Sequence, residues 1–427
     1  MVTIKDIAKE SGVSVATVSN VINGKAKVGE ETKKRVLGVI RKTGYRPNSI
    51  AQGLRSQSTQ TVGIIAEDLA QFSTPYLVDG IMSVLEKHGY RTSIWNMRMY
   101  ARWSDTWYDN PREYHEALDP ILDSIESCML DGVIYVAGHA RIVDCFQKGF
   151  PHPAVMAYAY SRNTEIPSVL IDDEEAGYRM GRYLIQKGHR KIGVLGGMPD
   201  NIHAQQRLLG YQQALFEAKI LYDPSLVIYS GWDDEGAYDN ADTLIDSGVT
   251  AVFCMNDRVA AGVYRRLDER GMRPGRDFSV TGFDNAEYSR YYIPVVTTMS
   301  LPLTEIGQCS AEYLLEQIAG KSPADQPSET KIRCALVEGK SVVQLRQDTE
   351  TAEEQPEDRL QETAKDENGA EETSDSREAG QAIDGTVRMP DRLEPEQNLR
   401  DINRIRNNPA DEQAVCGTEQ IAGQAGG

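Results

Sequence analysis

Apolar residues near the start of the chain recur at helical spacing in three short segments. The first helix begins at Ile4, the second follows Ser14, and the third spans Glu30 to Thr43 and ends at Gly44. The positions expected to face a common core are Ile4, Ile7 and Ala8, then Val18, Val21 and Ile22, then Val36, Leu37 and Ile40. This pattern predicts three short amphipathic helices.

The residues around the first two helices predict a helix-turn-helix. Thr3 and Asp6 suit a capping box at the start of the first helix, and Ser14 can cap the second. Ala8 is small enough for the second helix to cross closely, and Gly12 tolerates the positive φ of a tight turn. An ordinary helical hairpin is the alternative, but it would not need all these features in register.

The second helix is left with Val15, Ala16 and Asn20 on the face that could meet DNA bases. Asparagine can bond adenine through two hydrogen bonds, and valine and alanine suit thymine methyl groups. Residues 1–58 hold eleven lysines and arginines against four acidic residues, whereas the whole chain carries a net charge of −18. A basic segment on an acidic protein favours binding to nucleic acid phosphates.

Beyond residue 60, β-branched apolar runs alternate with helical stretches. The expected strands are Thr61–Ile65, Arg91–Trp95, Asp131–Val136, Lys191–Gly196, Leu226–Tyr229, Ala251–Met255 and Phe278–Phe283, with a helix around Leu77–His88. Nearly continuous apolar strands separated by helices indicate parallel sheets covered on both faces. The stretch to residue 345 is too long for one such sheet, so two α/β lobes are expected.

Residues 2–55, including the run from Gly44 to Arg55, closely resemble the headpiece of the lactose/galactose-repressor family. The resemblance implies that a homodimer binds a pseudo-palindromic operator, and that residues 48–55 form a hinge helix only when two subunits pair on the DNA. A family leucine, matched by Leu54, wedges into the central minor-groove step and bends the DNA. The DNA-binding positions expected on this basis are Thr3, Ser14, Val15, Ala16, Thr17, Asn20, Asn23 and Leu54.

Five later segments look like successive signatures of the same family's regulatory core: Gly188–Gly193, Arg207–Tyr211, Asn256–Asp257, Gly282–Asn285 and Val296–Thr298. The resemblance implies a core like the periplasmic sugar-binding proteins, with two lobes joined by three crossovers. The expected divisions are a headpiece (1–46), a hinge (47–59), a core (60–348) and a tail (349–427). Within the core, the first lobe is expected at about 60–161 and 292–322, and the second at about 162–291 and 324–348.

A small polar effector, most simply a sugar, is expected in the cleft between the lobes. Polyhydroxylated ligands need a fork of donors, a carboxylate acceptor and an aromatic face. Arg207 matches the family's effector-binding arginine and Asp284 its hydroxyl-accepting carboxylate. Asn256 matches a polar contact from the second lobe, Trp232 a stacking aromatic, and Phe72 is a further candidate in the loop after the first strand. The alternatives are helix capping for Asp284 and a surface salt bridge for Arg207.

Residues 95–114 depart from the family pattern, because this segment is longer and more aromatic. It contains Trp95, Tyr100, Trp103, Trp107, Tyr108 and Tyr114. The segment could form a lid over the cleft or a surface for a partner; local packing against its own lobe is the alternative.

The tail, residues 349–427, contains no aromatic residue and carries twenty acidic against eight basic side chains. Such a composition cannot bury enough apolar surface to offset the entropy of ordering, so disorder is expected. The resemblance does not extend to this segment.

Other function classes find little support. No signal-peptide pattern and no run of eighteen apolar residues occurs, which predicts a cytoplasmic protein without a membrane span. The six cysteines and six histidines lack metal-ligand spacing, and no metal or cofactor is expected. Phosphate-loop, nucleophile-elbow and zinc-protease motifs are also missing, so an enzyme is not expected.

The sequence therefore predicts an all-α helix-turn-helix headpiece, an α/β two-lobed core of the periplasmic-binding-protein type, and a disordered C-terminal tail. The expected function is a transcriptional regulator, most simply a repressor, whose operator affinity is switched by a small polar ligand. One alternative is a global carbon-catabolite regulator whose co-effector is a phosphorylated carrier protein. An alternative of another class is a sugar-binding transport protein.

Overall fold

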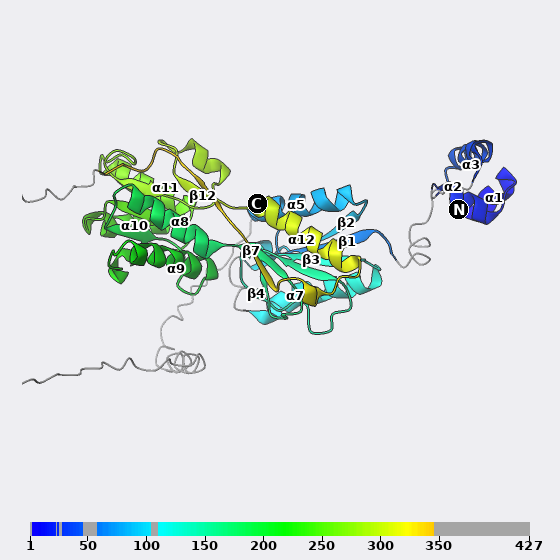
Figure 1. The fold of residues 1–427 in the computed structure, drawn as a ribbon, viewed down its shortest axis with the longest axis horizontal. Coiled ribbons are helices and arrows are strands. Elements are labelled where there is room, and N and C mark those ends of the chain that lie inside the picture. The colour runs from blue at the N-terminus through cyan, green and yellow to red at the C-terminus, as the bar shows by residue number, and fades with distance from the viewer. Residues whose placement is uncertain (1, 23, 25–27, 46–57, 104–109, 346–427) are drawn as a thin grey trace, which may run out of the picture. The chain divides into compact units, whose positions relative to one another are not determined.

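The computed structural model describes residues 2–22, 24, 28–45, 58–103 and 110–345 (Figure 1). The predicted DNA contacts Asn23 and Leu54, the hinge helix and the acidic tail lie outside the described residues, as do Trp107 and Tyr108. Those expectations stay predictions.

The headpiece contains α1 (Ile4–Ser11), α2 (Val15–Ile22) and α3 (Glu30–Thr43). The predicted capping box is confirmed, because the Thr3 hydroxyl accepts from the Asp6 backbone and the Asp6 carboxylate accepts from the Thr3 backbone at 2.8 Å. Gly12 ends α1 with φ of 64°, and the Ser14 hydroxyl accepts from the Thr17 N–H at 3.1 Å. These caps satisfy backbone groups that would otherwise lack partners at the helix ends.

A small core joins the three helices. Its buried members are Ile7, Ala8, Val18, Val21 and Val36. The expectation for Leu37 is wrong, because this side chain is exposed on α3 and Val39 packs on the core in its place. The apolar face of α3 that meets the core therefore consists of Val36, Val39 and Ile40.

The first lobe is built on a six-stranded sheet in the order β13-β7-β5-β3-β1-β2, and every neighbouring pair is parallel. The strands are β1 (Thr61–Ala66), β2 (Arg91–Asn96), β3 (Gly132–Val136), β5 (Ala154–Ala157), β7 (Ser168–Ile171) and β13 (Glu329–Ile332). Two short strands, β4 (Ile142–Val143) and β6 (Tyr160–Ser161), pair separately. The carboxyl ends of β1 and β3 lie side by side, which brings the loops that follow them together.

Helices cover both faces of this sheet, as predicted. Side chains of α5 (Thr74–Lys87) and α12 (Leu303–Ile318) share one apolar cluster with Val62 and Ile64 of β1. Those of α7 (Pro111–Ser127) and the short α6 (Met99–Trp103) share another with Ile65, on the opposite face of the same strand. Figure 1 shows α12 lying beside α5.

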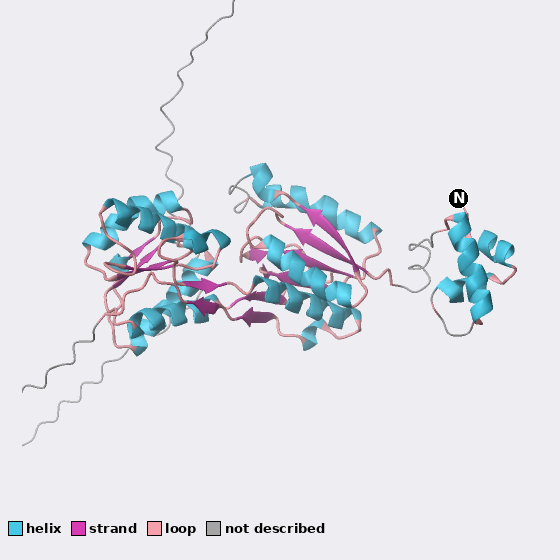
Figure 2. Ribbon diagram, turned by 90° about the horizontal axis from the view of Figure 1, so that it is seen from above, coloured by secondary structure: helices cyan, strands magenta, loops and turns pink. Residues whose placement is uncertain are grey.

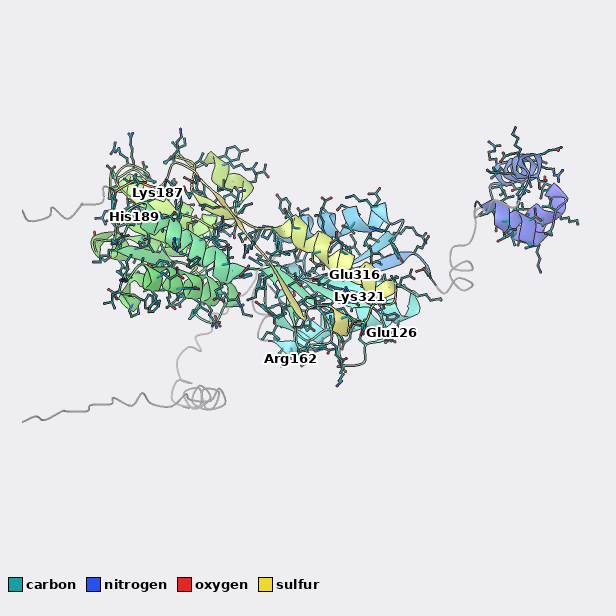
Figure 3. The ribbon with its side chains drawn as sticks, in the orientation of Figure 1. Glu126, Arg162, Lys187, His189, Glu316 and Lys321 are labelled. Atoms are coloured by element: carbon teal, nitrogen blue, oxygen red, sulfur yellow. The ribbon has the colours of Figure 1, made fainter. Side chains whose placement is uncertain are left out.

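Polar contacts fix the connection from α12 to β13. Glu316, labelled in Figure 3, accepts from Lys321 at 2.8 Å and from Gln326 at 3.0 Å. The short helix η4 (Pro323–Asp325) lies within this connection. Gln326 also accepts from Gln317 at 2.9 Å, so the turn is tied to the helix that precedes it.

The second lobe is built on a parallel four-stranded sheet in the order β11-β10-β8-β9 (Figure 2). Its strands are β8 (Ile192–Leu195), β9 (Val227–Ile228), β10 (Ala251–Cys254) and β11 (Ser279–Thr281). One face packs on α8 (Asp173–Gln186) and α9 (Ile202–Glu217), and the other on α10 (Asp234–Asp246) and α11 (Asp257–Glu269). Two short helices, η2 (Pro224–Leu226) and η3 (Glu287–Tyr291), lie in connections.

Three connections join the lobes. The first runs from β7 directly into α8. The other two contain β12 (Thr298–Ser300) and β14 (Ala335–Val337), which pair antiparallel. Each connection lies about ten residues later than the predicted lobe boundaries, because β7 and β13 belong to the first sheet. The boundaries predicted from the sequence place both strands in the second lobe. The pattern does not reveal them, because β7 is only four residues long and β13 is a largely polar edge strand.

Candidate functional site

Several residues predicted to contact DNA have structural roles within the headpiece. Thr3 and Ser14 are exposed but act as helix caps, and the Thr17 hydroxyl bonds that of Ser14 at 2.9 Å. Val15 lies half-buried against the headpiece core. Side chains on the outer face of α2 therefore include Ala16, which is exposed, and Asn20, which is half-exposed. Base contacts by these residues stay predictions.

In the core, Arg207 is held in one orientation inside the second lobe. It lies on α9 with only 3% of its surface exposed. Its Nε donates to Asp173 at 2.8 Å, Nη1 donates to the main-chain oxygen of Met255, and the guanidinium carbon lies 3.6 Å from the ring centroid of Phe283. Nη2 makes no hydrogen bond to any residue that the structure describes. The arginine is therefore part of a buried ion pair, unlike a surface salt bridge, with one nitrogen free for a ligand.

Asp173 stays ionised beside this arginine. Burial opposes its ionisation, but electrostatic interactions and hydrogen bonds with His203 and Arg207 outweigh burial and lower the Asp173 pKa. Burial likewise opposes the charge on Arg207, and Asp173 outweighs it and raises the Arg207 pKa. The two charges therefore neutralise each other within the lobe.

Asp284 lies near this pair and has no partner of its own. It follows β11 with φ of 107°, a region that residues with side chains rarely adopt, and its N–H donates to Met299 at 2.8 Å. Its carboxylate accepts no hydrogen bond from the described residues, and it caps no described helix. Burial raises the Asp284 pKa well above its usual value; Arg207 opposes this rise, and Asp257 and Asp173 add to it.

Trp232 and Asn256 are joined to the same group. The Trp232 ring centroid lies 6.0 Å from the guanidinium carbon of Arg207. Asn256 caps α11 by accepting from the Val259 N–H at 2.7 Å, and its amide donates to the main-chain oxygen of Trp232 at 3.0 Å. The structure thus shows a structural role for Asn256, and its contact with a ligand stays a prediction.

Phe72 is not brought to this group. It is 49% exposed in the loop between β1 and α5, and no contact among the described residues joins it to Arg207. The aromatic segment nearby packs on its own lobe: Tyr114 is buried, and Trp95, Tyr100 and Trp103 lie against the α7 side of the sheet. For the described part of residues 95–114, local packing accounts for the aromatic residues.

Reasoning from the sequence missed Asp173 and His203 as site residues, although Arg207 follows His203 by one helical turn. It also missed the role of Asp257, which is fully buried. Its carboxylate accepts from Thr298 at 2.7 Å and from the Ala286 N–H at 2.8 Å, joining α11, the loop after β11 and β12. Burial raises the Asp257 pKa to about 6, against the lowering effect of these hydrogen bonds.

Two family descriptions match the chain. "Bacterial regulatory proteins, lacI family" covers residues 3–48, and "Periplasmic binding protein-like domain" covers residues 182–342. The HTH-type transcriptional repressor PurR of Vibrio atlanticus is 31% identical over 75% of this chain and 93% of its own length. Catabolite control protein A of Priestia megaterium is 32% identical over 76% of this chain and 94% of its own length.

The chain belongs to the lacI family.

Solved structures of the lacI family share the fold. The lac repressor dimer bound to operator and the anti-inducer ONPF has a TM-score of 0.65 at 25% identity, covering 80% of this chain and 99% of that one. A lacI-family regulator from Enterococcus faecium with bound ribose has a TM-score of 0.53 at 25% identity, covering 67% and 100%. As a family member with its own headpiece, the chain is a DNA-binding transcriptional regulator that responds to a ligand. A transport protein is thereby set aside.

The relatives are transcriptional repressors, not enzymes. Across the described residues, no helix is long and apolar enough to cross a membrane. The same residues contain no group of three or more side chains suited to hold a metal ion, and all five cysteines among them are free.

Proposed function

We propose that this lacI-family regulator is a homodimeric repressor that binds a pseudo-palindromic operator through α2. Its operator affinity is switched by an uncharged polyhydroxylated ligand, most simply a sugar, held against Arg207 and Asp284. The relatives support this class: the lac repressor was solved as a dimer on operator DNA, and another relative is the ribose operon repressor of Haemophilus influenzae.

The observation that carries the ligand proposal is the arrangement of charge around Arg207. Its guanidinium is fixed by Asp173 and by Met255, which leaves Nη2 as a donor without a partner among the described residues. Asp284 offers an acceptor near it, and Trp232 an aromatic face. A vicinal diol can accept a hydrogen bond from Nη2 of Arg207 and donate one to Asp284, which is the chemistry of sugar recognition.

The same charges argue against an anionic ligand. Because Asp173 already neutralises Arg207, a phosphate or carboxylate would find no uncompensated cation there, and its charge would further oppose the ionisation of Asp284, whose pKa burial already raises. Burying an anion beside an unpaired carboxylate is costly. Sugars without phosphate or carboxylate groups therefore fit this site better than sugar phosphates or sugar acids.

The test is a thermal-shift screen of the full chain with neutral mono- and disaccharides beside their phosphates, followed by calorimetric titration. Neutral sugars should raise the melting temperature of the wild type and of Arg162→Lys, an exposed-arginine control, but not of Arg207→Lys. Lysine keeps the charge that Asp173 needs and loses the planar fork. If only phosphorylated carrier protein, and no sugar, changes operator binding, the carbon-catabolite alternative is correct.

A further inference from the structure

A buried hydrogen bond joins the two lobes beside Arg207. Ala140, in the loop after β3 of the first lobe, donates its N–H to Nε2 of His203 at 2.9 Å. His203 lies on α9 of the second lobe, and its Nδ1 lies 2.6 Å from Oδ2 of Asp173. All three residues are buried. A chain of contacts therefore runs from a backbone amide of one lobe, through His203 and Asp173, to Arg207 of the other.

The partners of His203 determine where its proton lies. A backbone N–H can only donate, so Nε2 accepts from Ala140 and carries no proton. The proton of the neutral ring must then sit on Nδ1, which donates to Asp173 Oδ2. The other oxygen of Asp173 accepts from Arg207, so one carboxylate holds both side chains. Rotation of the imidazole would break the contact with Ala140 and the contact with Asp173 together.

The first lobe holds the Ala140 amide in place. Buried Glu67, directly after β1, accepts from the Gly138 N–H at 2.9 Å, from the Tyr135 hydroxyl at 2.7 Å and from Arg141. The Ser73 hydroxyl donates to the Gly138 carbonyl at 2.6 Å. Residues on both sides of Ala140 are thus anchored to the sheet, and its amide is presented to the second lobe in a fixed position.

We propose that His203 is a positioning residue that couples the contact between the lobes to the orientation of Arg207. When the lobes are in contact, Ala140 fixes the imidazole, the imidazole fixes Asp173, and Asp173 fixes the guanidinium. When they separate, Nε2 loses its donor, the imidazole is released, and Asp173 holds Arg207 less firmly. The functional meaning rests on the proposed ligand site at Arg207; the coupling itself does not depend on any ligand.

The variants at His203 separate its two bonds. Glutamine places its oxygen near the position of Nε2, so His203→Gln keeps an acceptor for Ala140. Asparagine places its amide near the position of Nδ1, so His203→Asn keeps the donor to Asp173 and loses the bond between the lobes. Gln206→Leu is the control, because Gln206 makes a separate bond between the lobes, to the Tyr160 hydroxyl at 3.0 Å.

The experiment is hydrogen–deuterium exchange of the full, ligand-free chain, resolved to single amides at residues 138–141. The Ala140 amide should be protected in the wild type, in His203→Gln and in Gln206→Leu. In His203→Asn it should exchange roughly threefold to tenfold faster, the factor expected for one lost hydrogen bond. The Gly138 amide, bonded to Glu67, is the internal reference and should not change.

Coupling is tested at a distance by Arg207→Lys, which keeps the positive charge beside Asp173 and loses the planar guanidinium that Asp173 and Met255 hold. Arg207 makes no hydrogen bond to Ala140 or to His203 among the described residues. Faster exchange at Ala140, with Gly138 unchanged, is the expected result. Unchanged Ala140 exchange in His203→Asn would overturn the bond between the lobes, and unchanged exchange in Arg207→Lys would overturn the coupling. Because these measurements need no ligand, they stand apart from the sugar screen, whose failure would overturn the proposed function alone.

Discussion

Arg207 and Asp173 form a buried ion pair, with 2.8 Å between Nε and Oδ1 and 3% of each side chain exposed. The pair joins α9 to the first turn of α8, directly after the chain enters the second lobe. Removing one member of such a pair leaves a buried charge without its partner and costs about 3–5 kcal/mol. Arg207→Ala is therefore expected to destabilise the core, and variants that keep the positive charge are the better functional probes.

The first prediction concerns base reading by α2. Asn20→Ala should cost about 1–3 kcal/mol of binding at one position of the operator, because the amide can bond adenine through two hydrogen bonds. The measurement is selection from a randomised half-site library with the wild type and Asn20→Ala. Asn240→Ala is the control, because Asn240 lies on α10 of the second lobe, outside the headpiece. An unchanged base preference in Asn20→Ala would show that another residue reads that position.

The second prediction concerns the crossing of α8 and α9. A Cβ at Gly210 would lie 1.8 Å from the carbonyl oxygen of Glu174, so the helices must separate to admit it. Gly210→Ala should lower the stability of these helices by about 1–3 kcal/mol. Gly38, on α3, has open space around it, and Gly38→Ala should stabilise the headpiece by about 0.5–1 kcal/mol. Native-state hydrogen exchange of α8 and α3 measures both; equal effects of the two substitutions would contradict the packing described.

The third prediction concerns the pH dependence of stability. Since burial raises the Asp257 pKa to about 6, the folded chain binds this proton more tightly than the unfolded chain does. The contribution of Asp257 to the free energy of unfolding should therefore fall as pH rises from about 4 through 6, by roughly 3 kcal/mol in total.

Asp257→Asn removes this titration. Relative to the wild type, its free energy of unfolding in urea should rise with pH over that range and level off near pH 7. The exposed control Asp239→Asn should show no such trend. Parallel pH profiles for the wild type and Asp257→Asn would mean that Asp257 titrates at its ordinary value.

The fourth prediction concerns the acidic tail. A chain truncated after Gln347 should keep the melting temperature and oligomeric state of the full chain, because residues 349–427 contain no aromatic residue and few other large apolar side chains. Non-specific DNA affinity at low salt should rise, since this truncation removes twenty-one acidic residues, Asp348 included, along with eight basic ones. A lower melting temperature would indicate that the tail packs on the remainder.

The headpiece was predictable because its signals are local. Thr3, Gly12 and Ser14 act on backbone groups within a few residues of themselves, so sequence spacing determines their geometry. The α/β core was predictable from its apolar strands. The lobe boundaries were not, because β13 is an edge strand, Glu329–Ile332, with alternating exposed and half-buried residues and no apolar run.

In the candidate site, too, some features could be predicted from the sequence and others could not. Arg207 and Asp284 were singled out by resemblance, and the structure brings them near each other. Their surroundings depend on contacts between distant segments: Asp173 meets Arg207 across 34 residues of chain, and Ala140 meets His203 across 63. No local sequence pattern predicts such pairings. For Phe72, sequence reasoning predicted a place in the ligand site, and the structure shows no contact between Phe72 and Arg207.

The central claim is that a ligand bound by Arg207 and Asp284 controls operator binding. The most direct measurement is fluorescence anisotropy of the selected operator with the full chain, titrated with the sugar identified by the thermal-shift screen. Asp284→Asn is the decisive variant, because Asp284 has no partner among the described residues whose loss would confuse the result. The sugar should shift operator affinity for the wild type and for Asp239→Asn, and fail to do so for Asp284→Asn at the same concentrations. A full response in Asp284→Asn, with undiminished sugar affinity, would contradict the account and place the effector site elsewhere.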